Sequence, residues 1–246
     1  MDDLVLRDDA DGITTLTFNR ADKLNALSPS LFVRLRTHLE AIVGDPEGVG
    51  AVILRGAGRS FSAGNDLKAI QAGDAAPTAN FQSDTLRLIE RLPQPVIAAV
   101  RGHCYTGALE LALACDLLVC SEDARFADTH GKWAMTPRWG MSQRLPRRVG
   151  VLKAREMMLT GRVVGGREAV EIGLANSSVP DADLDGEARR LAEDMVANSW
   201  HSLRGVKMLL NTGQNYGLAD GLDYELEHSP GRGPDLEERL KAFGGG

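Results

Sequence analysis

Residues 95–120 read PVIAAVRGHCYTGALELALACDLLVC, and this stretch decides the fold class. Pro95–Val100 is a short apolar run without alternation, which is typical of a strand buried on both faces. Gly107–Cys115 predicts an apolar helix, and Asp116–Cys120 predicts the next strand. Strands that alternate with helices pair in parallel, and the helices cover the sheet. We therefore expect an α/β fold built on a parallel sheet.

The sequence upstream of this stretch repeats the same alternation. Ala51–Arg55 is a short apolar run that ends at Gly56 and predicts a second buried strand. Ile13–Phe18 alternates Thr with larger apolar residues after the Asp11-Gly12 turn and predicts a third strand. Two helices are expected between these strands. The first is Pro29–Val43, with Ser28 as its N-terminal cap. The second is Pro77–Leu92, and Pro93 and Pro95 terminate it.

The character of the chain changes after about residue 183. Apolar stripes at helical spacing follow, and no strand pattern appears; the stripes are Leu184, Ala188, Leu191 and Met195, then Leu203, Val206 and Leu210, then Leu218, Leu222 and Leu226. We place a boundary near Val179-Pro180-Asp181, with residues 1–180 as the core and 181–246 as a helical C-terminal region. The stripes fit either the body of this chain or a neighbouring subunit, and sequence alone leaves both open.

Composition excludes several classes of protein. The 246 residues carry 28 basic and 34 acidic side chains, and a net charge of −6 disfavours nucleic-acid binding. Cys104, Cys115 and Cys120 form neither a disulfide framework nor a zinc-ligand pattern, so we expect no metal site. No apolar run approaches the ~18 residues of a bilayer-spanning helix, and the acidic N-terminus does not resemble a signal peptide. The expectation is a cytoplasmic protein that binds neither membranes nor nucleic acid.

Two glycine-containing turns stand out because each follows a predicted strand and precedes a helix start. The first is RSFSAGNDLK at residues 59–68, and the second is GHCYTGALEL at residues 102–111. The N-terminus of a helix leaves unpaired N–H groups that attract an anion. If the two turns face each other, two N–H groups converge on one oxygen atom and form an oxyanion hole. On spacing alone, ordinary strand-to-helix turns explain these segments at least as well.

The chain resembles the crotonase (enoyl-CoA hydratase/isomerase) family from end to end. The resemblance rests on the order and spacing of several motifs together, namely Asn19-Arg20 and Leu24–Leu27, Phe61–Leu67, Pro95–Gly102, Gly107 with Glu110–Ala112, Cys115-Asp116, Gln143–Leu145 with Gly150, Thr160-Gly161, and Ala169 with Gly173–Ala175. It implies a superhelical spiral of ββα units followed by a C-terminal helical trimerisation region. It also implies that the backbone N–H groups of Asn65 and Gly107 hold the carbonyl oxygen of an acyl-CoA thioester.

Glu110 stands where the family has its first catalytic glutamate. Its neighbours in sequence, Ala108, Leu109, Leu111 and Ala112, are all apolar. Burial among them would raise the pKa of the carboxyl and make it an acid–base group near neutral pH. The alternative is an exposed helix glutamate, and the apolar neighbours on both sides favour the catalytic interpretation.

The family's second glutamate is absent from this chain. Counting without gaps from Phe126 to Pro137 places His130 at that position. An imidazole exchanges protons near pH 7, so His130 either replaces the missing carboxylate or only makes local hydrogen bonds. Asp128, two residues earlier, is expected on the opposite face if the strand continues that far.

The resemblance also implies which residues contact the acyl-CoA. The expected substrate-binding residues are Lys23, Ala26, Ala63, Asp66, Leu67, Lys68 and Tyr105, with Lys23 and Lys68 offsetting phosphate charge. Lys241 would reach the CoA of a neighbouring subunit. Coenzyme A enters as part of the substrate, and no separate cofactor is expected. Arg138 and Trp139 replace residues that are small in the family, and they either shorten the acyl pocket or pack elsewhere.

The function expected from these observations is the hydration of trans-2-enoyl-CoA to 3-hydroxyacyl-CoA in fatty-acid or related acyl-CoA metabolism. Glu110 would deprotonate the water that attacks C3. The proton at C2 would come from the same water through Glu110, or from His130. One alternative is Δ3-Δ2 enoyl-CoA isomerisation, which needs only one proton carrier. Another is an acyl-CoA-binding homologue with little catalytic activity.

Overall fold

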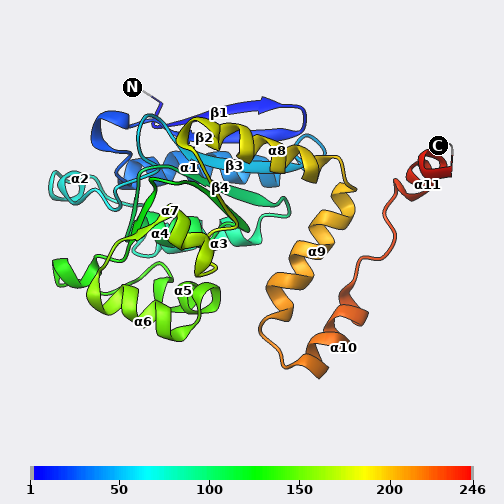
Figure 1. Ribbon diagram of the computed structural model, residues 1–246. Coiled ribbons are helices and arrows are strands. Elements are labelled where there is room, and N and C mark those ends of the chain that lie inside the picture. Colours follow the sequence, from blue (N-terminus) through cyan, green and yellow to red (C-terminus); the bar gives the residue numbers. More distant parts are fainter. Residues whose placement is uncertain (1–2, 245–246) are drawn as a thin grey trace.

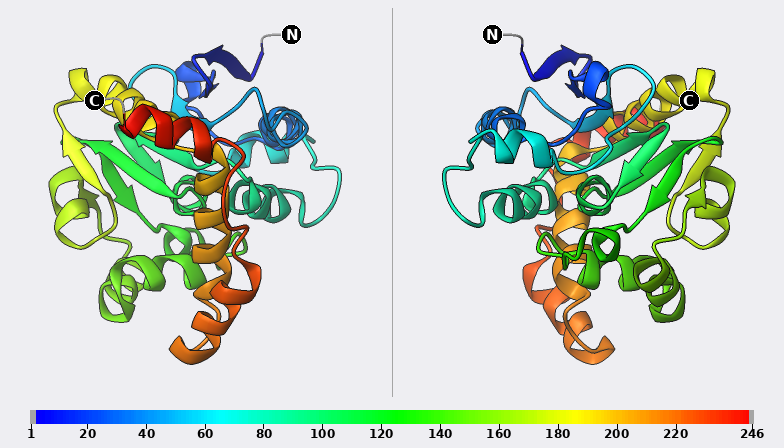
Figure 2. Two further views of the ribbon diagram at one scale, coloured as in Figure 1. Left: turned by 90° about the vertical axis from the view of Figure 1, so that its right-hand side faces the viewer. Right: turned by 90° about the vertical axis from the view of Figure 1, so that its left-hand side faces the viewer.

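The computed structural model describes residues 3–244 and shows two sheets with helices packed around them (Figures 1 and 2). The strands are β1 (Val5–Ala10), β2 (Ile13–Phe18), β3 (Ala51–Gly56), β4 (Val96–Val100), β5 (His103–Tyr105), β6 (Leu117–Ser121), β7 (Arg125–Ala127), β8 (Val164–Gly165) and β9 (Ser177–Val179). The α-helices are α1 (Pro29–Val43), α2 (Leu67–Gln71), α3 (Phe81–Arg91), α4 (Gly107–Leu113), α5 (Met141–Val149), α6 (Val151–Thr160), α7 (Gly166–Glu171), α8 (Leu184–Val196), α9 (Trp200–Gly213), α10 (Leu218–His228) and α11 (Leu236–Gly244). Short 3-10 helices are η1 (Ala21–Lys23), η2 (His130–Trp133) and η3 (Asp181–Asp183).

The larger sheet has the strand order β1-β2-β3-β4-β6-β9, and the smaller sheet has the order β5-β7-β8. In the larger sheet β1 pairs antiparallel with β2, whereas the other neighbouring strands pair in parallel. Strands β5 and β7 are also parallel, and β8 runs antiparallel to β7. The α/β fold predicted from residues 95–120 is confirmed.

The central strands are apolar on both faces because each face of the larger sheet is covered. Alternate residues of β3 show this: Val52 and Leu54 pack into the cluster that α1, α3 and α4 complete. Ala51 and Ile53 face the other way and pack against α8. These strands are therefore continuous apolar runs. A strand in a sheet with one solvent-exposed face would instead alternate apolar and polar residues.

The strongest sequence patterns predicted their elements closely. The predicted bounds of Pro29–Val43 and Ile13–Phe18 are those observed, and Ser28 caps α1 by accepting a hydrogen bond from the Leu31 N–H at 3.2 Å. The helix expected from residue 77 begins only at Phe81. Strands β5, β8 and β9 were not expected, because two or three residues give no measurable periodicity.

The helical C-terminal region consists of two parts that pack differently. In α8 the residues Leu184, Ala188 and Ala192 are buried against the larger sheet. Helices α9, α10 and α11 instead extend away from the body (Figure 1). We call these three helices the arm. Its contact with the body includes the buried Lys207, whose Nζ donates to Asp116 Oδ2 at 2.6 Å.

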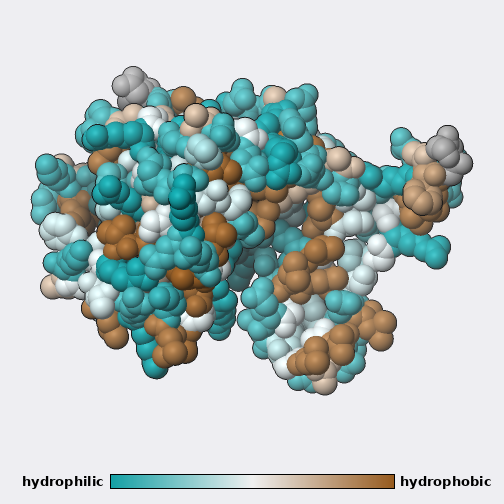
Figure 3. All heavy atoms as spheres, viewed as in Figure 1, coloured by the Kyte–Doolittle hydropathy of each residue, from teal (hydrophilic) through white to brown (hydrophobic). Residues whose placement is uncertain are grey.

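The apolar stripes of the arm remain largely exposed. The side chains of Leu210, Leu218, Leu222 and Leu226 are 61%, 82%, 58% and 84% exposed. Figure 3 shows apolar surface gathered on this part of the molecule. The stripe that begins at Leu184 thus packs against the body. The stripe that begins at Leu218 is not covered by any other segment of the described residues. Across residues 3–244, none of the helices has the length and apolar character needed to cross a bilayer.

Candidate active site

The two glycine-containing turns lie side by side because Ser62 in the first pairs with β5 in the second. The N–H of Ser62 donates to His103 O at 2.9 Å, and the N–H of Tyr105 donates to Ser62 O at 3.4 Å. Gly64 then turns with a φ of +99°, and a Cβ at this position would come within 2.7 Å of Tyr105 O. Only glycine permits both the left-handed φ and this close approach. The same Cβ position lies 3.9 Å from Gly107 N, so the turns meet beside the start of α4.

The backbone N–H groups of Asn65 and Gly107 have no protein acceptor among residues 3–244. Leu27 bonds to the residues on either side of Asn65, accepting from Asp66 N at 3.0 Å and donating to Gly64 O at 2.8 Å. This parallel bridge turns the N–H of Asn65 away from Leu27. Gly107 begins α4, where an N–H has no partner within the helix. Two free donors at adjacent turns are the arrangement that an oxyanion hole requires.

Asp66 supports the first turn through its side chain. Its carboxylate accepts from Arg20 at 2.8 Å and from the Ala69 N–H at 2.9 Å, which caps α2. Burial alone would raise the pKa of Asp66, but these two hydrogen bonds and the Arg20 charge outweigh burial and lower it. Arg20 also donates to Ala26 O and so joins two of the predicted CoA-binding segments. The Asp66 carboxylate is thus occupied in holding Asn65 in place.

Glu110 is 1% exposed and is fixed by the backbone of a distant segment. Its Oε1 accepts from the N–H groups of Trp139 at 2.9 Å and Met141 at 3.0 Å. Its Oε2 lies 3.8 Å from His130 Nε2. One oxygen is therefore anchored, while the other faces an imidazole at a separation that a single water molecule can bridge.

His130 is held by Asp128, and the expectation that Asp128 would face the opposite way is wrong. Residues two apart on a strand share a face, so alternation itself does not separate Asp128 from His130. Strand β7 ends at Ala127, and the chain turns into η2 at His130. Asp128 Oδ1 accepts from His130 Nδ1 at 2.6 Å and from the His130 N–H at 3.0 Å. Asp128, His130 and Glu110 therefore form a chain of three titratable groups.

Burial and neighbouring charges shift the pKa values of Glu110 and His130. Burial raises the pKa of the Glu110 carboxyl, although the N–H of Met141, the charge of His130 and the N–H of Trp139 oppose it. Burial alone would lower the pKa of His130. The hydrogen bond from its ring to Asp128 and the charges of Asp128 and Glu110 outweigh burial and raise that pKa. Both shifts favour a state in which Glu110 and His130 exchange a proton near neutral pH.

Trp139 contributes its ring as well as its backbone to the site. A Cβ added to Gly107 would overlap the Trp139 six-membered ring, so this ring lies directly against the first residue of α4. The ring also meets Phe32 edge to face, with centroids 5.2 Å apart. Trp133, in contrast, is 62% exposed. Of the two tryptophans in this segment, Trp139 is the one that limits the space beside Gly107.

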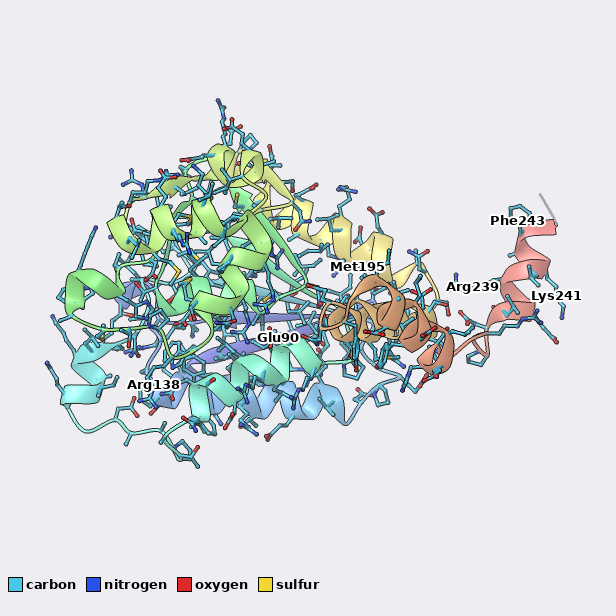
Figure 4. The ribbon with its side chains drawn as sticks, turned by 90° about the horizontal axis from the view of Figure 1, so that it is seen from below. Glu90, Arg138, Met195, Arg239, Lys241 and Phe243 are labelled. Atoms are coloured by element: carbon cyan, nitrogen blue, oxygen red, sulfur yellow. The ribbon has the colours of Figure 1, made fainter. Side chains whose placement is uncertain are left out.

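The remaining predicted residues surround the turns without forming one cluster. Lys23 and Lys68 are exposed, whereas Ala26, Ala63, Leu67 and Tyr105 are half-buried along the two turns and the Leu24–Leu27 segment. Lys241 and Arg138 are labelled at opposite ends of the molecule, so Lys241 does not reach the site of its own chain (Figure 4). Within the part of the chain that the structure describes, no group of three or more Asp, Glu, His or Cys residues is arranged to hold a metal ion.

Comparisons with known proteins agree on one family. Residues 8–238 match the family model described as Enoyl-CoA hydratase/isomerase. The chain is 35% identical over 224 residues to an Arabidopsis thaliana protein named probable enoyl-CoA hydratase 1, peroxisomal, covering 91% of this chain and 84% of the relative. The crystal structure of an enoyl-CoA hydratase from Bacillus anthracis aligns with a TM-score of 0.92 at 34% identity, covering 98% of this chain and 96% of that one. A monofunctional enoyl-CoA isomerase from M. smegmatis aligns with a TM-score of 0.78 at 34% identity, covering 89% and 97%.

Proposed function

The chain belongs to the enoyl-CoA hydratase/isomerase family, and on that premise we propose that it hydrates trans-2-enoyl-CoA to 3-hydroxyacyl-CoA. The names of its relatives support an acyl-CoA enzyme at the coarser level. The observation that supports hydration in particular is the opposition of Glu110 Oε2 and His130 Nε2 across 3.8 Å. Hydration needs one group to take a proton from water and one to deliver a proton to C2, and this pair supplies both.

The thioester carbonyl oxygen would bind to the N–H groups of Asn65 and Gly107. As water adds to C3, negative charge moves onto this oxygen and the enolate forms. The two hydrogen bonds strengthen with that charge, so they stabilise the transition state more than the bound substrate. One such donor typically contributes ~3–4 kcal/mol. The Trp139 ring and the buried start of α4 reduce water access and so strengthen these hydrogen bonds.

Proton transfer would involve both groups in turn. The Glu110 carboxylate takes a proton from the attacking water, and the hydroxide adds to C3. Protonated His130 gives its Nε2 proton to C2, which completes the addition of one water molecule. Glu110 is then protonated and His130 neutral, and transfer of the proton between them through a solvent molecule restores the starting state. The cycle consumes no redox equivalent, so we propose that no cofactor is needed beyond the CoA of the substrate.

Isomerisation of a 3-enoyl-CoA to a 2-enoyl-CoA is the second candidate. It is favoured by the similarity to a structure named a monofunctional enoyl-CoA isomerase. It is also favoured by the site itself, where Glu110 is present and His130 stands at the position of the family's second glutamate. Glu110 alone would remove a proton from C2 and return it to C4. The third candidate function is that of a homologue that binds acyl-CoA with little turnover. Such binding would need only the two glycine-containing turns.

A spectroscopic assay separates these functions. With trans-2-butenoyl-CoA, a hydratase removes the absorbance of the conjugated enoyl thioester. With a 3-enoyl-CoA, an isomerase creates that absorbance. Calorimetric binding without either signal identifies the non-catalytic homologue. Failure to bind acyl-CoA of any chain length at millimolar concentration would contradict the whole assignment.

The arm supports a homotrimer or a dimer of trimers. Its exposed leucines form an apolar surface of the kind that subunit interfaces bury (Figure 3). Phe243, at the far end of α11, is 89% exposed and lies far from the body (Figure 4). In such an assembly Lys241 would come near the CoA of a neighbouring subunit. Sedimentation of the protein as a monomer at micromolar concentration would contradict this proposal.

A further inference from the structure

Asp128 has no place in the sequence motifs that identify the family, yet it makes the shortest contact with His130. It is 2% exposed, and its Oδ1 accepts from both the ring Nδ1 and the backbone N–H of His130. Burying a carboxylate in this way is costly unless it has partners. The hydrogen bonds to His130 are the contacts that offset the cost of burying this carboxylate.

A carboxylate facing Nδ1 selects one tautomer of the imidazole. Asp128 can only accept, so Nδ1 must carry a hydrogen, and the exchangeable position of neutral His130 becomes Nε2. Nε2 is the ring atom that lies 3.8 Å from Glu110 Oε2. We propose that Asp128 is a positioning residue that fixes His130 as the Nδ1–H tautomer, so that Nε2 exchanges the proton that Glu110 also handles. The proposal rests on the proposed function of this same site.

The segment that holds Asp128 and His130 is tied to the second turn. Thr129 Oγ1 and Thr106 Oγ1 lie 2.5 Å apart, and the Thr129 N–H donates to Thr106 Oγ1 at 3.1 Å. The Thr106 N–H donates to Ala127 O at 2.8 Å. Thr106 precedes Gly107 and has a φ of +52°, a conformation that non-glycine residues adopt only when their surroundings enforce it. These contacts fix the imidazole relative to the oxyanion donor.

The charged groups facing His130 come from two elements. Asp128 lies in the loop after β7, and Glu110 comes from α4. Both are carboxylates, so both favour the imidazolium, but only Asp128 makes a hydrogen bond to the ring. Replacing Asp128 by Asn keeps the size of the side chain and an oxygen acceptor while removing the charge. The pKa of His130 should then fall, and the amide can present its NH2 to the ring and permit the other tautomer.

The test is Asp128→Asn in the full-length enzyme, with ring nitrogen NMR titration of the histidines and steady-state kinetics. We expect the pKa of His130 to fall by ~1 unit or more, as for loss of a neighbouring opposite charge. We expect kcat on trans-2-butenoyl-CoA to fall by ~10²-fold or more with little change in KM, and the alkaline limb of the pH profile to move to lower pH. His103 is the internal reference, because its Nδ1 pairs at 3.0 Å with the Ser60 hydroxyl, and its titration should not move.

Each outcome is decisive. An unchanged His130 titration and tautomer in Asp128→Asn would overturn the proposal, as would an unchanged pH profile with only a lower melting temperature. Asp74→Asn, which removes a carboxylate bonded to Ser30 near the start of α1, should leave both readouts unchanged. If wild-type protein does not turn over enoyl-CoA, the proposed function fails, while the NMR titration still decides the role of Asp128.

Discussion

Glu110 and His130 face each other across the same site, but the chain holds them by different means. Glu110 Oε1 is fixed by two backbone N–H groups, those of Trp139 and Met141. His130 is fixed by one side chain, the carboxylate of Asp128. Backbone donors persist when neighbouring side chains change, whereas a side-chain partner is lost in one substitution. The position of Glu110 is thus set by the backbone of the fold, whereas the position of His130 depends on the identity of residue 128.

The largest loss of activity is expected when the Glu110 carboxylate is removed. In Glu110→Gln the amide oxygen still accepts from the Trp139 and Met141 N–H groups, so the fold should persist. The variant has no carboxylate to accept a proton from water. We expect kcat on a 2-enoyl-CoA to fall by ~10⁴-fold, the upper end of a general acid–base contribution.

Glu40→Gln is the matched control, because Glu40 pairs with Arg36 on the outer face of α1. It should retain wild-type kcat. An active Glu110→Gln enzyme would overturn the acid–base assignment as a whole.

Removing the imidazole should have a smaller effect. In His130→Ala we expect kcat to fall by ~10²-fold, because Glu110 can still carry a proton in both directions, though with one fewer partner. His130→Glu would place two carboxylates opposite each other and should recover part of the lost rate. If His130→Ala keeps the wild-type kcat and loses only thermal stability, the imidazole has no part in the mechanism.

The same contrast explains how much of the site the sequence predicted. Glu110 and its turn follow a buried strand in one continuous segment, so local pattern and family resemblance were sufficient to place them beside the first turn. The role of Asp128 was missed because it was assigned to the face opposite His130, although residues two apart on a strand share a face. Strand β7 ends at Ala127, and the end of a three-residue strand cannot be predicted from periodicity.

Contacts between distant segments were beyond what the sequence could predict. Nothing in the segment around Trp139 indicates that its N–H bonds to a carboxylate 29 residues earlier or that its ring covers Gly107. The only available signal was bulk at a position where the family has small residues. For the arm, helical spacing predicted the helices, but the exposure of the third stripe follows from the direction in which α9 leaves the body.

Substituting Trp139 separates two contributions of one residue, because its backbone N–H supports Glu110 while its ring limits the space beside Gly107. Trp139→Ala keeps the N–H that Glu110 accepts from, so activity on a four-carbon substrate should largely persist. The vacated volume should raise kcat/KM for an eight-carbon enoyl-CoA relative to the four-carbon substrate by ~10-fold or more.

Trp133→Ala is the control from the same segment, since Trp133 is 62% exposed and should not change chain-length preference. An unchanged preference in Trp139→Ala would show that the ring does not bound the acyl pocket.

The pH dependence gives the smallest effect. In the proposed mechanism the active state has Glu110 ionised and His130 protonated, so kcat/KM should rise as pH passes the pKa of Glu110 and fall above the pKa of His130. Both of these pKa values are raised, so both limbs should lie at higher pH than for an isolated glutamate and histidine. The two limbs belong to the coupled pair rather than to either residue alone. In His130→Ala the alkaline limb should disappear. The positive charge that lowers the pKa of Glu110 is also lost, so the acidic limb should move to higher pH, by ~1 unit. An acidic limb that stays in place would show that the two groups do not share a proton, and Glu110 would then act alone.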